Sequence, residues 1–313
     1  MFGYLARRIG LGVVTVLVAS ALSFLLVHAS GGSPGAITAG EGATKAQIAA
    51  ENVRLGWDRP LVAQYGTWLG HAVRSNFGVS LIDGHGIWPD LMQRIPVTAS
   101  IAVFATLFSA ILGILIGVVA AVRRGRLDRL ITVTSGIMLS LPQFWLGILL
   151  VYVLSVKARL LPATGYVGFM ASPTQYFQSL VLPVLALGLT GAAIIVRTTR
   201  AGMVNALQQE HIRTLRALGT PVWRIRYLHA LRFAGAPVVS VLGIQFFALF
   251  GGSVIIEQLF ALPGLGQAAQ TAINTHDFPA VQGVVVIATV VVVITNLVLD
   301  LVLAALDPKV RAA

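Results

Sequence analysis

Between two long apolar segments, residues 197–232 read RTTRAGMVNALQQEHIRTLRALGTPVWRIRYLHALR. Apolar positions three and four apart predict one helix, with a stripe formed by Val204, Leu207, His211, Ile212, Leu215 and Leu218. Gly219 follows, and glycine readily takes the left-handed conformation that ends a helix. Thr220 is then the expected cap of a second helix, with Pro221 in its first turn.

From its residues alone, this interval has three possible roles. A basic amphipathic helix often lies on anionic lipid. The interval can equally be a solvated loop, or it can insert into a soluble partner. Composition favours lipid or solvent over a partner, and the three alternatives stay open at this point.

Composition places the chain in a membrane. Of its 313 residues 57% are hydrophobic and only 11% are charged, whereas soluble domains carry about 25% charged residues. The absence of cysteine excludes disulfides, zinc–thiolate sites and cysteine nucleophiles. The net charge of +11 is what positive cytoplasmic loops produce, so we predict no nucleic-acid partner.

Apolar segments long enough to cross a bilayer recur along the chain. We predict an all-α integral membrane protein with six transmembrane helices, a large first extracytoplasmic loop and a cytoplasmic loop at about 203–232. The first span is expected to stay uncleaved, because its apolar run exceeds the core of a signal peptide. The six predicted spans cover residues 9–29, 96–122, 130–155, 180–196, 233–256 and 281–303.

The distribution of arginine and lysine predicts the orientation. Most basic residues fall in loops that share one side if both termini are cytoplasmic, as the positive-inside rule requires. In the outer loop between the first two spans, Thr44 and Gln47 form a predicted capping box, and Pro60 opens a further helix. We divide the chain into an N-terminal span with an extracytoplasmic cap, 1–95, and a core of spans two to six, 96–313.

The interval Glu210–Gly219, EHIRTLRALG, resembles the cytoplasmic EAA loop of ABC importer permeases, in particular the dipeptide, oligopeptide and nickel branch. Leu215 and Leu218 depart from that pattern, in which a small residue and a lysine are usual. The resemblance extends over nearly the whole chain. It is carried also by residues 56–65, by LSLPQFWLG at 139–147, by residues 257–266 and 277–283, and by Asn296, Asp300 and Asp307-Pro308.

This resemblance implies a permease subunit of an ATP-driven importer in the bacterial inner membrane. It would form half of the translocation pathway for di- or oligopeptides delivered by an extracytoplasmic solute-binding protein. A second homologous permease subunit and two ABC ATPase subunits, separate or fused, would complete the assembly in the lipid bilayer. The residues it implies for ATPase docking are Leu207, Gln208, Glu210, His211, Ile212, Arg213, Thr214, Arg216, Ala217 and Gly219.

Other functions fit the sequence less well. The chain lacks a GxxxxGK[ST] loop, so ATP and Mg²⁺ would bind to the partner subunits, and we expect no bound cofactor, no metal and no enzyme activity. A secondary transporter usually carries intramembrane carboxylates, whereas the predicted spans are uncharged until Asp300. Nickel or glutathione remain alternative substrates. Polar and small residues that could line a pathway, or simply pack between helices, are Gln143, Phe144, Gln245, Gly251, Gly252 and Asn296.

Overall fold

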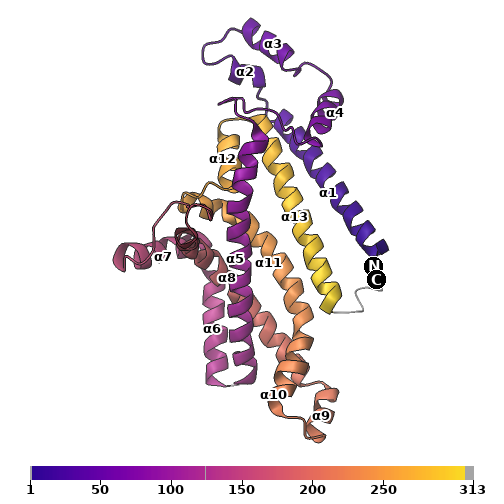
Figure 1. The fold of residues 1–313 in the computed structure, drawn as a ribbon, viewed down its shortest axis with the longest axis vertical. Helices are drawn as coiled ribbons and strands as arrows, with labels where there is room; N and C mark the ends of the chain where they lie inside the picture. The colour runs from indigo at the N-terminus through magenta and orange to yellow at the C-terminus, as the bar shows by residue number, and fades with distance from the viewer. Residues whose placement is uncertain (1, 124, 307–313) are drawn as a thin grey trace. The chain divides into compact units, whose positions relative to one another are not determined.

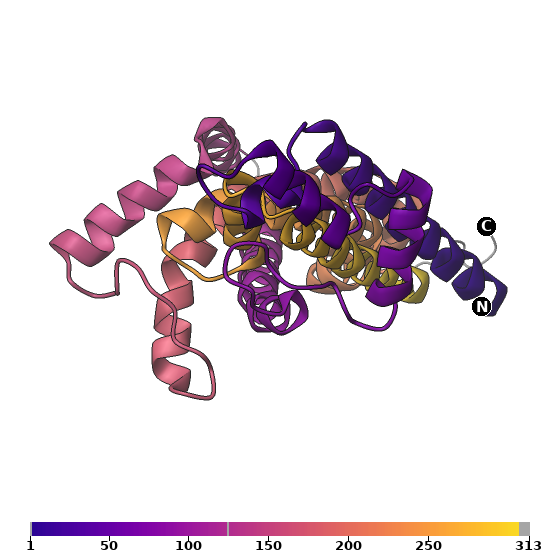
Figure 2. The ribbon, with the colours of Figure 1, turned by 90° about the horizontal axis from the view of Figure 1, so that it is seen from above.

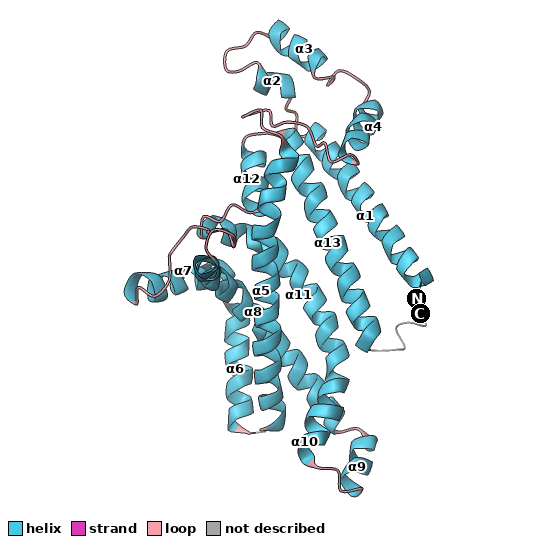
Figure 3. Ribbon diagram, in the orientation of Figure 1, coloured by secondary structure: helices cyan, strands magenta, loops and turns pink. Residues whose placement is uncertain are grey.

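The structure, a computed structural model, describes residues 2–123 and 125–306. Within these residues the chain is helical apart from loops and one isolated bridge between Val79 and Gly86 (Figures 1 and 3). It forms two compact units, which we describe separately. The first contains residues 1–97 and 263–297, and the second contains residues 98–262 with the segment that starts at Val298. The predicted Asp307-Pro308 motif lies outside the described residues.

The first unit begins with an apolar helix and carries the short helices of the first loop. Helix α13 packs beside α1, and Gln282 Nε2 of α13 donates a hydrogen bond to the carbonyl oxygen of Ser20 of α1 at 2.7 Å. The capping box of Thr44 and Gln47 is confirmed at the start of α3. The helices of this unit are α1 (Phe2–Ala29), α2 (Pro34–Thr38), α3 (Lys45–Arg54), α4 (Leu61–Ala72), the first turns of α5 (Ile87–Val122), α12 (Leu265–Asn274) and most of α13 (Phe278–Leu306).

The second unit is built around α8, which has the most buried residues of any helix in this unit. Helix α11 packs along α8, and α6 and α7 also contact it. Helix α5 approaches α8 closely at Gly117, where a Cβ would lie 2.6 Å from Thr199 Cβ. The unit contains most of α5, then α6 (Arg126–Ser140), α7 (Gln143–Leu150), the π-helix η1 (Val151–Lys157), α8 (Pro173–Leu207), α9 (Glu210–Ala217), α10 (Val222–Arg224), the π-helix η2 (Ile225–Ala230) and α11 (Leu231–Leu259).

The predicted third span, residues 130–155, is not one continuous helix. It breaks between Ser140 and Gln143, and the two halves meet at an angle of 100°. Pro142 lacks an N–H and takes an extended conformation at the start of α7, so the helical hydrogen bonds cannot continue through it. Seen from above, the segment with α7 and η1 projects sideways from the rest of this unit (Figure 2).

Several predicted boundaries were wrong in the same direction, because helices continue beyond the apolar core of each span. Helix α5 begins at Ile87 rather than near Pro96, and the side chains of Asp90 and Arg94 pair in its first turns. Helices α8 and α11 likewise extend past the predicted ends of spans four and five. Proline is tolerated in long apolar helices when neighbouring groups satisfy the freed carbonyl.

By length and composition, five helices can cross a membrane, and a sixth span results if the bent pair α6–α7 counts as one. The all-helical, multi-span fold class predicted from the sequence is therefore confirmed, with its third span broken. The boundary predicted at residue 95/96 stays a prediction.

Candidate functional site

The polar interval between spans four and five forms one exposed helix at the end of the second unit (Figure 1). Helix α8 does not end near Val196 but continues to Leu207, and α9 then spans Glu210–Ala217. The predicted single helix with a stripe from Val204 to Leu218 is therefore wrong. Two residues, Gln208 and Gln209, separate the end of α8 from α9.

The apolar face of α9 is narrower than the sequence suggested. Ile212 is completely buried and Leu215 is partly buried, so this pair holds α9 against η2. His211 is exposed, and Leu218 is 75% exposed. These two residues were wrongly assigned to the buried stripe, because the break after Leu207 changes the rotational phase of the helix.

Gly219 ends this helical segment as predicted. Its φ is +75°, a conformation that an L-residue with a Cβ adopts at a cost. A Cβ at Gly219 would meet no atom within 4 Å, so the requirement for glycine at this turn comes from the backbone alone.

The second predicted helix is not separate from span five. Helix α10, η2 and α11 form a continuous helical segment from Val222 to Leu259. Pro221 takes the N-cap position without a side-chain cap, so the predicted capping role of Thr220 was wrong. Since proline at a helix start loses no helical hydrogen bond, Pro221 alone can begin the segment.

Small apolar side chains join the helices behind α9. Met203 and Ala206 of α8 are fully buried with Ala230 of η2 and Ala234 of α11, and Ala121 of α5 completes the contact. Because all of these side chains except Met203 are small, the helices pack closely, as they do inside a protein. The loop is therefore carried by a packed base rather than by flexible linkers.

The exposed face of α9 carries charges that nothing in the described part of the chain neutralises. The side chains of Glu210, Arg213 and Arg216 are exposed and make no ion pair with any described residue. Arg213 and Arg216 also line a cleft of about 460 Å³, together with Arg226 of η2. Such a surface can bind a partner with complementary charges.

The predicted docking residues lie on α9 and within three residues of its ends. The exposed members are Gln208, Glu210, His211, Arg213, Thr214, Arg216, Ala217 and Gly219, whereas Leu207 is partly buried and Ile212 is completely buried. Leu207 and Ile212 therefore position the surface rather than form it. No contact with another protein is part of the structure, so the docking role stays a prediction.

Two of the predicted pathway residues, Gln143 and Gly252, lie together in the second unit. Gln143 Nε2 donates a hydrogen bond to Thr190 Oγ1 at 3.2 Å. A Cβ at Gly252 would lie 2.8 Å from Gln143 Oε1, so the glycine leaves room for this side chain. Gln143 is partly buried beside α8 and α11, a position compatible with helix packing as well as with a pathway.

The other predicted pathway residues are scattered. Gln245 is only 5% exposed, Phe144 is 45% exposed, and Gly251 is exposed with no atom within 4 Å of an added Cβ. Asn296 is exposed on α13 and belongs to the other unit. The pathway assignment therefore stays a prediction for all of them.

Sequence reasoning missed a buried acidic group in the second unit. Glu257 is fully buried, and its Oε1 accepts hydrogen bonds from Thr98 Oγ1 at 2.7 Å and from Ser253 Oγ at 3.1 Å. A second missed pair joins Asp128 of α6 to Arg200 of α8. The available signal for Asp128 was an acidic residue among the four arginines of 123–129, and the partner could not be identified from sequence spacing.

Comparison with known proteins places these features in a family. Residues 113–312 match the family described as "Binding-protein-dependent transport system inner membrane component", and residues 1–102 match the N-terminal segment of the corresponding membrane component. A "Probable peptide ABC transporter permease protein" of Sinorhizobium fredii is 34% identical over 309 residues, covering 98% of this chain and 99% of that protein. The dipeptide transport system permease protein DppB of Escherichia coli K12 is 33% identical over 339 residues, covering 99% of each.

Solved structures show the same fold. A chain of the MetNI methionine ABC transporter in an inward facing conformation superimposes with a TM-score of 0.54 at 19% identity. This match covers 69% of the present chain and 96% of the other. A second crystal form of that transporter gives a TM-score of 0.57 at 18% identity, covering 70% and 96%.

Proposed function

The chain belongs to the family of binding-protein-dependent transport system inner membrane components, and on that premise we propose that it is the permease subunit of an ATP-driven peptide importer. The observation that carries the proposal is the match to relatives named as peptide or dipeptide permeases at 33–34% identity over nearly the full length of both chains. A multi-pass helical fold agrees with such a subunit.

Energy for uphill transport would come from a separate ATPase. The sequence has no Walker A phosphate loop, so nucleotide hydrolysis belongs to partner subunits that carry ATP and Mg²⁺. We propose that α9 is the element that inserts into them. The support is geometric: α9 is exposed, carries unpaired Glu210, Arg213 and Arg216, and rests on a packed base through Ile212.

The proposed assembly contains a second permease, two ATPase subunits and an extracytoplasmic binding protein that delivers the peptide. Both termini and α9 would face the cytoplasm, which agrees with the concentration of arginine near α9. Movement of α9 with the ATPases would rotate spans four and five and open the pathway to alternate sides of the membrane. Gln143, Gln245 and Gly252 would lie along that pathway.

The test is transport by the reconstituted complex. The chain would be co-expressed with its partner permease and ATPases, purified and placed in liposomes with the binding protein outside and ATP inside. We expect uptake of a radiolabelled dipeptide that stops when the ATPase carries a Walker-lysine substitution. Uptake of Ni²⁺ or glutathione but of no peptide would assign the transporter to one of those substrates instead.

Purified without its partners, the chain is expected to hydrolyse no ATP. ATP hydrolysis by the isolated chain, at a rate comparable to that of the complex, would contradict the proposal that partner subunits hydrolyse the ATP.

A further inference from the structure

The first unit contains a pocket that carries charges of both signs. Its volume is about 590 Å³, and it lies between the loop 80–86 with the first turns of α5 on one side and α12 with the start of α13 on the other. The charged lining includes Asp83, Asp90 and Arg94, and Thr271 and Thr275 of α12 add hydroxyl groups. Pockets of 300–1,000 Å³ with a few placed polar groups are typical of small-molecule sites.

Asp83 supplies a preorganised anion at this site. Its Oδ1 accepts a hydrogen bond from the backbone N–H of His85 at 3.0 Å, and Ser80 Oγ accepts bonds from the backbone N–H groups of Ile82 and Asp83 at 3.2 and 3.3 Å. The backbone hydrogen bond from His85, followed by the side-chain bond with Ser80, lowers the pKa of Asp83 below its usual value. The carboxylate is therefore ionised at neutral pH. Its side chain is 60% exposed, and the ring Nδ1 of His85 lies 3.4 Å from Oδ1.

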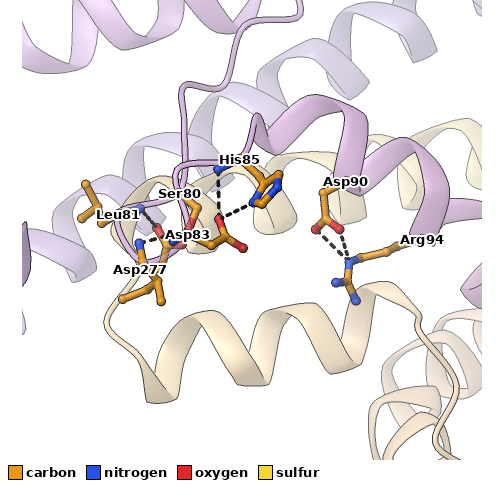
Figure 4. Close-up of polar contacts among 8 residues, drawn as sticks. Ser80, Leu81, Asp83, His85, Asp90, Arg94 and Asp277 are labelled. Atoms are coloured by element: carbon orange, nitrogen blue, oxygen red, sulfur yellow. Dashed lines mark hydrogen bonds and ion pairs between the residues drawn. The ribbon is translucent and has the colours of Figure 1, made fainter.

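Arg94 supplies the cation. Its Nε donates to both carboxylate oxygens of Asp90, at 2.9 and 2.8 Å, which fixes the plane of the guanidinium group. The two terminal nitrogens point away from Asp90 in Figure 4, and no described residue accepts a hydrogen bond from them. The Arg94 side chain is only 26% exposed, so it is held along the pocket wall rather than extended into solvent.

A buried carboxylate fixes the loop that carries Asp83. Asp277, which is 4% exposed, accepts a hydrogen bond from the backbone N–H of Leu81 at 3.2 Å and one from Ala280 at 3.5 Å. Figure 4 shows Asp277 meeting Leu81 from the chain segment opposite. Because this bond ties the loop to the start of α13, the anion is placed on a fixed frame rather than on a mobile loop.

From this arrangement we propose that the pocket binds the charged termini of a free peptide. The α-ammonium group is held by the exposed carboxylate of Asp83, and the α-carboxylate is held by the terminal nitrogens of Arg94. Charge-assisted hydrogen bonds of this kind are stronger than neutral ones, and a guanidinium is well shaped for a carboxylate. The inference rests on the proposed function and adds to it a second peptide site, outside the predicted pathway residues.

The lining favours a zwitterion over other ligands. Asp83, Asp90 and Asp277 outnumber the single Arg94 and would repel an anionic lipid headgroup. No group of three His, Cys, Asp or Glu side chains among the described residues is placed to hold a metal ion. A ligand with one positive and one negative end can meet the exposed carboxylate of Asp83 and the terminal nitrogens of Arg94 at the same time.

The test pairs each variant with a matching change in the peptide. Binding of alanyl-phenylalanine, its N-acetyl form and its C-terminal amide would be measured by calorimetry on the full chain in nanodiscs. Blocking either terminus should weaken binding roughly tenfold or more, since a hydrogen bond to a charged group contributes that much. Asp83→Asn should weaken binding of the free peptide but not of the N-acetyl peptide, and Arg94→Gln should weaken binding of the free peptide but not of the amide.

The matched controls are Asp58→Asn and Arg74→Gln, which change exposed charges of the same unit outside the pocket, and neither should alter binding. Equal affinity for free and blocked peptides would overturn the proposal. So would an equal loss for every peptide in both pocket variants, because that pattern indicates damage to the fold rather than loss of one contact.

A third measurement separates this inference from the proposed function. If the reconstituted complex imports no peptide at all, the proposed function fails. If it imports peptide and the Asp83 and Arg94 variants bind and transport all three peptides like the parent chain, only the pocket proposal fails. Weaker docking of the binding protein in these variants, with peptide binding unchanged, would assign the pocket to protein contact and would also overturn it.

Discussion

Replacing Gly219 by valine tests whether α9 couples the membrane helices to an ATPase. The φ of +75° at this residue costs an L-residue about 1–2 kcal/mol. For a β-branched residue such as valine, the cost lies at the upper end of this range. Because a Cβ there would meet no atom within 4 Å, the cost is confined to the backbone and adds no steric clash with neighbouring helices. The turn would relax by moving α9 relative to α10.

A strain of this size is too small to unfold a packed helical unit but large enough to move a local equilibrium. A cost of about 1–2 kcal/mol lowers the ratio of native to relaxed turn by about 5–30-fold. We therefore expect peptide-stimulated ATP hydrolysis by the reconstituted Gly219→Val complex to fall by a factor in that range. Expression and membrane insertion of the chain should be unchanged.

Two variants control for the strain itself. Gly219→Asn should retain most of the coupling, because asparagine enters the left-handed conformation more easily than valine. Gly40→Val places the same substitution at a φ of +81° in the first unit, also with no atom within 4 Å, and should leave coupling intact. The reasoning is refuted if Gly219→Val shows normal stimulated hydrolysis and normal co-purification of the ATPase.

Three further predictions address the docking surface, the packing and the topology. Reversing both charges at Glu210 and Arg213, which are exposed and three residues apart, should reduce ATPase co-purification severalfold in a pull-down, with unchanged yield of the permease; normal recovery would exclude this face as the docking surface. Gly117→Val should lower the free energy of unfolding by about 1–3 kcal/mol through overpacking, since a Cβ there lies 2.8 Å from a backbone carbonyl oxygen of α8. Its melting temperature in detergent should fall, whereas Gly136→Val, with open space around it, should melt like the parent. A reporter inserted near Gly40 should be active only outside the cytoplasm and one fused to the C-terminal residue only inside, and a cytoplasmic signal at position 40 would overturn the orientation.

Features set by a few neighbouring residues could be predicted from the sequence. The capping box of Thr44 with Gln47 and the left-handed turn at Gly219 depend on local backbone geometry, and both are found. The six apolar segments also predicted the membrane fold, because a span of about 20 apolar residues leaves few alternatives. Local rules were sufficient wherever the determining partners are close in the chain.

Features set by tertiary packing could not be predicted. No local sequence feature near Leu207 indicates that α8 continues to this residue. The last turns of α8 are stabilised by the burial of Met203 and Ala206 against η2 and α11. Proline at position 142 indicated a disturbance, but the 100° bend depends on how α7 packs on α8 and α11. The charged pocket was missed for a related reason, since Asp83 and Arg94 are far from α12 in the sequence and line the pocket with it only in the folded chain.

The continuity of the helices that flank α9 bears directly on how a docking element could drive transport. Helix α8 runs unbroken from Pro173 to Leu207, and the helical segment that follows α9 runs from Val222 to Leu259. A helix resists bending over such lengths unless a proline, glycine pair or π-bulge interrupts it. Pro183 lies inside α8, Pro237 and the pair Gly251-Gly252 lie inside α11, and the π-helix η2 is closer to α9 along the chain than any of these. A displacement of α9 would therefore pass along α8 at least as far as Pro183. On the other side it would pass through η2, which makes that π-helical turn the expected hinge between the docking surface and span five.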